Sequence, residues 1–152
     1  MEIATAATAN TTYFSKTFDE TMDLLVEARN YVAADTSRPY TPKQIDEQLT
    51  ICCETFRLTS RLTHVMAWLL AQRAVHEGEL TTADAASETY QLGGRKTCLE
   101  RNDAVSDVCD RHLSKLLDRS LRLYTRIARL DDMVRRNIDQ RLEIDRGKTV
   151  IH

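Results

Sequence analysis

The chain has 152 residues, of which 42% are hydrophobic and 29% are charged, and its formal net charge is −2. This length fits a single domain, and this composition is ordinary for a globular protein. The near-neutral balance excludes a global electrostatic attraction to nucleic acid or to an anionic membrane.

The charge is unevenly distributed along the chain. Residues 1–50 contain eight acidic and four basic residues, whereas residues 111–146 contain ten basic and six acidic residues. Opposite charges in two parts of a chain favour docking between complementary faces, within one molecule or between molecules.

The first twelve residues, MEIATAATANTT, have neither the basic start nor the apolar centre of a secretory signal. We therefore expect residues 1–12 to form a flexible N-terminal tail. The four cysteines show no disulfide framework, so we expect reduced thiols and a cytoplasmic protein. No apolar run is long enough to cross a bilayer, so we expect no membrane association.

The first helix is predicted from about Tyr13 to Ala34, because apolar residues recur there at steps of three and four. These residues are expected to form its buried face: Phe14, Phe18, Met22, Leu25 and Val32.

The second helix has a clear start signal, since Thr41, Pro42 and Gln44 fit a capping box with proline at the first helical position. It is predicted to continue to about Glu77, where Gly78 offers a left-handed stop. Two apolar stripes run along this helix. The first consists of Ile45, Leu49, Cys52, Phe56, Thr59, Thr63, Met66 and Leu70, and the second of Ile51, Leu58, Leu62, Val65 and Leu69. A helix with two such stripes is expected to be covered on two sides and to lie at the centre of the fold.

A short helix is predicted over residues 82–92 and ends at Gly93 and Gly94. The last long helix is predicted from about Ser106 to Ile144, and residues 145–152 are expected to form a frayed C-terminal tail. Its apolar seam consists of Leu113, Leu116, Ser120, Leu123, Ile127, Leu130 and Val134.

These elements predict an all-α fold: an antiparallel three-helix bundle over residues 13–144, with long helices and one short helix between the second and the third. The chain has only four glycines and two prolines, which agrees with long uninterrupted helices.

Two basic stripes are the candidate functional surfaces. Arg57, Arg61, His64 and Trp68 step by four, three and four along the second helix. They indicate either a solvated edge with a half-packed tryptophan or a partner-binding surface, since tryptophan and arginine are frequent interface hot spots.

The second basic stripe lies on the last helix and consists of Lys115, Arg119, Arg122, Arg126 and Arg129. It favours docking onto an acidic protein partner or onto the acidic first helix. The alternative is a nucleic-acid-associated regulator that uses the same arginines, and it would bind with strong salt dependence. Nucleic acid is the weaker alternative, because no helix-turn-helix spacing or stacking aromatics accompany the stripe.

No residues form a recognisable catalytic or cofactor motif. Phosphate-binding glycine loops and a nucleophile elbow are absent from the sequence. Cys109 and His112 could supply two metal ligands from one helical face, but a zinc site needs three or four. We therefore expect a protein that is not an enzyme and binds no metal or cofactor.

Four segments resemble the RcdA family of alphaproteobacterial regulators of CtrA degradation. They are YFSKTFDETMDLLVEARNYVA (13–33), CETFRLTSRLTHVMAWLLAQRAVHEGELT (53–81), YQLGG (90–94) and LLDRSLRLYTRIARLDDMV (116–134).

This resemblance implies a small dimeric helical bundle without catalytic residues. It further implies an adaptor of the ClpXP protease that acts with a response-regulator adaptor and brings in substrates or further adaptors for CtrA degradation. No partner site of the family maps onto particular residues of this chain.

Overall fold

The structure is a computed structural model that describes residues 2–36 and 45–149, with side chains described over 11–35 and 45–148. The described residues form three long helices and three helices of a single turn: α1 (Glu2–Thr36), α2 (Ile45–His76), α3 (Thr82–Ala85), α4 (Arg95–Cys98), α5 (Val105–Val108) and α6 (Arg111–Thr149).

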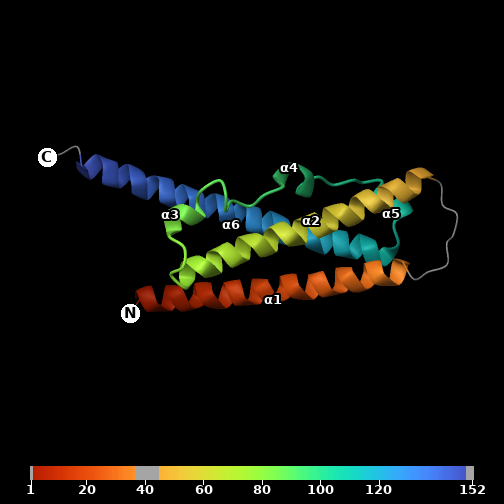
Figure 1. Cartoon of the computed structure of the whole chain (residues 1–152), viewed down its shortest axis with the longest axis horizontal. Helices are drawn as coiled ribbons and strands as arrows, with labels where there is room; N and C mark the ends of the chain where they lie inside the picture. The colour runs from red at the N-terminus through yellow and green to blue at the C-terminus, as the bar shows by residue number, and fades with distance from the viewer. Residues whose placement is uncertain (1, 37–44, 150–152) are drawn as a thin grey trace.

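The predicted all-α bundle is confirmed (Figure 1). The long helices α1, α2 and α6 lie alongside one another, and α2 packs more extensively on α1 and on α6 than those two pack on each other. Figure 1 shows that the segment carrying α3, α4 and α5 returns along α2 and α6, on the side away from α1. We call residues 86–110, which follow α3 and carry α4 and α5, the connecting segment.

The short helix predicted over residues 82–92 is confirmed only for its first turn, α3, and the chain between α2 and α6 contains three one-turn helices instead of one. Thr81 caps α3 as expected, since its Oγ1 accepts a hydrogen bond of 3.0 Å from the backbone N–H of Asp84. The helix nevertheless ends at Ala85, and α4 begins directly after Gly94.

The long helices differ from the prediction mainly at their ends. α1 begins at Glu2, eleven residues before the predicted start, and α6 continues to Thr149. The flexibility of residues 1–12 and of residues 145–152 stays a prediction. The predicted cap at Thr41, Pro42 and Gln44 lies outside the described residues.

Two helix ends have a local physical cause. α2 ends at His76, and Gly78 follows with φ +78°, the left-handed conformation that glycine adopts without a Cβ clash. α6 begins at Arg111 instead of near Ser106, because the Asp110 carboxylate accepts a 2.7 Å hydrogen bond from the N–H of Leu113.

The predicted buried face of α1 is only partly confirmed. Phe14, Phe18 and Leu25 are partly buried and pack against the core as predicted. Met22 and Val32 are exposed, and the core residues of this helix are Thr17, Thr21, Leu24, Ala28 and Tyr31. The two threonines tolerate burial because each hydroxyl donates to the carbonyl four residues earlier, at 2.9 and 2.7 Å.

The core confirms the predicted seam of α6 and one of the two stripes of α2. Leu58, Leu62, Val65 and Leu69 of the second stripe are buried. The first stripe is open to solvent in the single chain, where Ile45 is 74% and Phe56 is 69% exposed. The prediction that α2 is covered on both apolar sides is therefore wrong for one chain.

Candidate functional site

The basic stripe predicted on α2 faces the connecting segment. Arg61 and Trp68 are each only 2% exposed. The expectation of a solvent-facing stripe, or of a half-packed tryptophan, is therefore wrong for these two residues. His64 is half-buried, and the Arg57 side chain is 14% exposed.

Arg61 fastens the connecting segment to the bundle. Its guanidinium donates hydrogen bonds to the carbonyls of Cys98 and Glu100, both at 2.8 Å, and of Leu117 at 3.2 Å, and to the Ser120 hydroxyl at 3.3 Å. Burial, together with the nearby charge of Arg57, lowers the pKa of Arg61. The donors of this arginine are already used within the chain.

Arg57 lies one turn before Arg61 on α2 and also contacts the connecting segment. It donates to the Thr97 carbonyl at 3.1 Å, pairs with the buried Glu54, and reaches Glu100 at 3.3 Å. Its charge is therefore balanced by two carboxylates of the same chain.

Trp68 belongs to a buried polar network with Asp131 of α6. The indole N–H donates to the Asp131 carboxylate at 3.0 Å, and Arg95 and Arg135 each donate to its other oxygen at 2.7 Å. Asp131 is itself 2% exposed. A buried carboxylate needs such partners, so this network ties α2, α4 and α6 together.

His64 explains the paired glycines of the connecting segment. A Cβ on Gly93 would lie 2.9 Å from His64 Nδ1, and a Cβ on Gly94 would lie 2.7 Å from His64 Nε2. Gly94 also has φ +73°, and the hydroxyl of Tyr124 donates to the Gly93 carbonyl at 2.5 Å. The two glycines therefore let the backbone approach the imidazole closely.

The sequence pattern does not predict these internal contacts. At Gly93 and Gly94 the pattern indicates only the end of a helix, and nothing in it links Trp68 to Asp131, 63 positions later. The one available signal was the glycine pair itself, which often marks a close backbone approach.

The structure divides the basic stripe of α6 into two groups. Arg119 pairs with Glu27 at 2.6 Å, and Arg126 pairs with Glu20 at 2.5 Å. The hydrogen bond from Arg119, with a smaller contribution from His112, lowers the pKa of Glu27 below its usual 4.5. These contacts confirm the predicted docking onto the acidic first helix for Arg119 and Arg126.

The second group comprises Lys115, Arg122 and Arg129. All three are exposed and have no ion-pair partner among the described residues. Their spacing of seven places them on one line along α6, two turns apart. We call these three residues the cationic ridge. They are available to a carboxylate or phosphate of another molecule.

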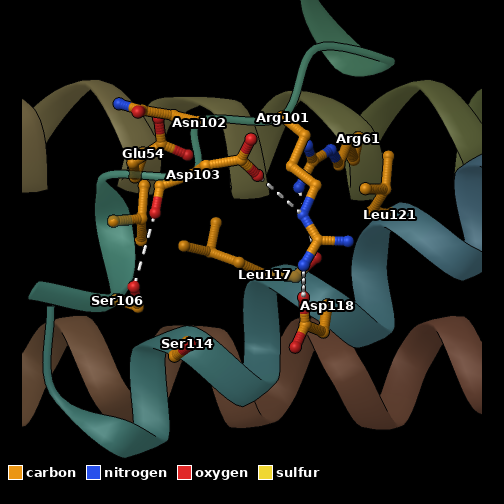
Figure 2. Close-up of a pocket in the computed structure, with 11 residues that line it drawn as sticks. Glu54, Arg61, Arg101, Asn102, Asp103, Ser106, Ser114, Leu117, Asp118 and Leu121 are labelled. Carbon is orange, nitrogen blue, oxygen red and sulfur yellow. Dashed lines mark hydrogen bonds and ion pairs between the residues drawn. The ribbon is translucent and has the colours of Figure 1, made fainter.

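A small polar pocket lies beneath the connecting segment (Figure 2). It encloses about 110 Å³, and Glu54 and Arg61 are among its lining residues. Figure 2 shows Arg101 reaching across it, with ion pairs to Asp103 at 3.5 Å and to Asp118 at 3.9 Å. The volume suits a few water molecules, and the charged groups already have partners.

A second hollow is an apolar groove between α1 and the end of α2. It measures about 620 Å³ and is lined by Phe14, Phe18, Leu69 and Val75 together with polar residues that include Arg73 and Glu77. Arg73 and Glu77 pair with each other at 2.9 Å. The groove can accept an apolar side chain.

The candidate metal ligands do not come together. Among the described residues, no group of three or more histidine, cysteine or carboxylate side chains could hold a metal ion. His112 lies 3.1 Å from Glu27 and packs edge-on against Tyr31, with ring centroids 5.2 Å apart. Within the same residues, no helix is both long and apolar enough to cross a membrane.

The fold and these surfaces define a class: a three-helix bundle whose buried polar groups hold its own connecting segment and whose free charges lie on the outside. The family model described as "Protein of unknown function (DUF1465)" matches residues 5–149. The crystal structure of RcdA from Caulobacter crescentus CB15 is similar, with 33% sequence identity and a TM-score of 0.60, over 80% of this chain and 89% of that one. No curated protein matches the chain. The chain belongs to this family, the RcdA family.

Proposed function

We propose that this protein is a non-enzymatic adaptor that tethers substrates or further adaptors to the ClpXP protease. Its role would be the regulated, cell-cycle-dependent degradation of the transcription regulator CtrA. Membership of the RcdA family and the resemblance of the four segments quoted above support this proposal. Its partners would be ClpXP, a response-regulator adaptor, the delivered substrates and a second copy of the chain, all in the cytoplasm.

The observation that carries the proposal is the cationic ridge. Lys115, Arg122 and Arg129 are unpaired on the surface, whereas neighbouring Arg119 and Arg126 are neutralised by carboxylates of α1. Exposed charges of one sign speed the encounter with an acidic protein and orient it. A tethering protein needs no more than such contacts, because tethering acts by raising the effective concentration of the substrate.

A reconstituted proteolysis assay tests the proposal. The parent protein should accelerate substrate degradation by the protease and its response-regulator adaptor. The variant Arg122→Glu/Arg129→Glu should lower this acceleration by roughly tenfold, since like charges across an interface repel.

The matched control is Arg141→Glu/Arg146→Glu, which makes the same change of charge at exposed positions further along α6. It should retain full acceleration. If the parent has no effect on degradation, the adaptor role is excluded. Equal loss in both variants would exclude the ridge as the contact surface.

The alternative role is nucleic-acid binding by the same three cations. It predicts a gel shift at low salt that weakens steeply as salt rises and is lost in Arg122→Glu/Arg129→Glu. Such a shift, together with no effect on proteolysis, would favour this alternative.

A further inference from the structure

The cationic ridge lies on an exposed strip of α6 between two occupied ones. On one side of it, Arg119 and Arg126 pair with carboxylates of α1. On the other side, Asp118 and Asp132 pair with arginines of the connecting segment. The ridge is therefore an open helical face between α1 and the connecting segment.

The contact between α1 and α6 shows how α6 receives an acidic helix. Glu20 and Glu27 are seven residues apart on α1, and they pair with Arg126 and Arg119, which are seven residues apart on α6. Equal spacing of seven on two helices keeps the paired side chains in line over successive turns. The reversed order of the pairs shows that the two helices run antiparallel.

The cationic ridge repeats this arrangement one row further around α6. Lys115, Arg122 and Arg129 have the same spacing of seven, about 10 Å at roughly 1.5 Å per residue. Unlike Arg119 and Arg126, they have no carboxylate opposite them within the described part of the chain. They are therefore complementary to carboxylates that a helix of another molecule carries at the same interval.

Apolar surface beside the ridge would add to these ion pairs. Met133 lies one turn beyond Arg129 and is 52% exposed. The aliphatic stems of the two ridge arginines supply further apolar area, because long basic side chains can bury their stems while the charged end stays in water. An amphipathic helix with apolar residues next to its carboxylates therefore fits this face better than a uniformly polar helix.

Negative charge beside the ridge limits what can dock there. Asp118 and Asp132 lie on the connecting-segment side, and each of their side chains is 48% exposed. A helix with its carboxylates in one row can face the ridge and avoid these aspartates, whereas a nucleic acid carries phosphates along its whole backbone. The face therefore favours a protein helix over nucleic acid.

We propose that the cationic ridge binds an amphipathic helix of a partner protein that carries carboxylates seven residues apart and runs antiparallel to α6, as α1 does. This inference rests on the proposed function and names the class of partner at the same surface. Three acidic side chains of the partner helix face Lys115, Arg122 and Arg129. In the antiparallel orientation, the acidic side chain nearest the C-terminus of the partner helix lies opposite Lys115.

Two designed peptides test the spacing. Both are alanine-rich helices of identical composition, with three glutamates and a leucine beside each. The glutamates are seven residues apart in the first peptide and five apart in the second, where they point around the helix. Each exposed ion pair strengthens binding about two- to threefold, so fluorescence anisotropy at low salt should show roughly tenfold tighter binding of the first peptide to the parent protein. Equal affinities of the two peptides would overturn the proposal.

Charge reversal tests the site. Lys115→Glu/Arg122→Glu/Arg129→Glu should lose the preference for the first peptide and bind instead a peptide with lysines seven residues apart. All three side chains are exposed, so the fold should survive, and circular dichroism checks this. The matched control Arg141→Glu/Arg146→Glu/Lys148→Glu makes the same change of charge further along α6 and should keep the preference. A reversed ridge that binds the first peptide as tightly as the parent does would exclude this site.

Carbodiimide cross-linking tests the orientation, and it needs only the parent protein. The reagent joins a glutamate carboxyl group to a lysine amine as an amide, and Lys115 is the lysine of the ridge. Mass spectrometry should find Lys115 linked to the glutamate nearest the C-terminus of the first peptide. A link to the glutamate nearest the N-terminus would overturn the antiparallel orientation, and links only to other lysines would overturn the site.

These results are independent of the proteolysis assay. If Arg122→Glu/Arg129→Glu loses substrate delivery while the two peptides bind the parent equally, the adaptor role stands and the helical partner is excluded. If the spacing preference holds while the parent has no effect on proteolysis, the docking site stands and the adaptor role is excluded. A short DNA duplex that binds at about 0.15 M salt, where neither peptide binds, would overturn the proposal in favour of nucleic acid.

Discussion

Replacement of Arg61 by methionine is the sharpest test of how the connecting segment is held. The substitution keeps an apolar stem of similar length and removes all donors of the guanidinium. Four hydrogen bonds are lost, to Cys98, Glu100, Leu117 and Ser120.

The four lost bonds do not cost the same. The Leu117 carbonyl keeps a hydrogen bond of 2.9 Å from the Ser120 hydroxyl, and the Glu100 carbonyl lies in an exposed residue that water can reach. The Cys98 carbonyl, in a fully buried residue, is left without its donor. An orphaned buried group costs about 1–3 kcal/mol, and the weaker losses add to it, while relief of the buried charge offsets part of the total. We expect a loss of about 2–4 kcal/mol in the free energy of unfolding.

Urea denaturation followed by circular dichroism and by the fluorescence of Trp68, the one tryptophan of the chain, measures this loss. In a thermal scan the midpoint should fall by about 5–15 °C for a chain of this size.

The control Arg122→Met changes an exposed arginine and should stay within about 0.5 kcal/mol of the parent. Faster trypsin cleavage after Arg95, Lys96 or Arg101 in Arg61→Met would show that the connecting segment detaches first. If Arg61→Met is as stable as the control, the guanidinium does not hold this segment.

Two further predictions follow from the same structure. Gly94→Ala should destabilise the fold by about 1–3 kcal/mol, because Gly94 has φ +73° and an added Cβ would meet His64. The control Gly147→Ala should be neutral or slightly stabilising, because a Cβ at this position would have nothing within 4 Å. Equal unfolding midpoints for the two variants would contradict the close approach of the backbone to His64. Glu27 has a pKa lowered below 4.5, so its contribution to stability is present above pH 4.5 and is lost as the pH falls through the lowered pKa. In urea melts across this range, Glu27→Gln should lose less stability on acidification than the parent, and identical pH profiles would show that the pair with Arg119 contributes nothing.

The sequence was sufficient for the long helices because their signals are local. The seam of α6, from Leu113 to Ile127, repeats at the helical period and is buried as predicted. The glycine stop after α2 is equally local, since Gly78 alone supplies the left-handed conformation. The opposite charges of the two chain segments also predicted contacts between α1 and α6, which the structure confirms for Arg119 and Arg126.

The sequence was not sufficient where one pattern permits two environments. Both stripes of α2 have the same period, and only the tertiary packing decides that Leu58 and Leu62 are buried while Ile45 and Phe56 are not. On α1 the apolar pattern did not indicate that Thr21 is buried. A threonine can replace an apolar residue in the core when its hydroxyl donates a hydrogen bond to a carbonyl of its own helix, as Thr21 does.

The candidate site shows the same division. The sequence by itself determined which residues form the two basic stripes, because side-chain direction on a helix follows from spacing. Only the tertiary structure decided that Arg61 and Trp68 are bonded inside the molecule, while Arg122 and Arg129 remain free on its surface. The physical reason is that the partners of Arg61 and Trp68 are 37 to 63 positions away in the chain. Helical periodicity relates only residues of the same helix, so it cannot predict these contacts.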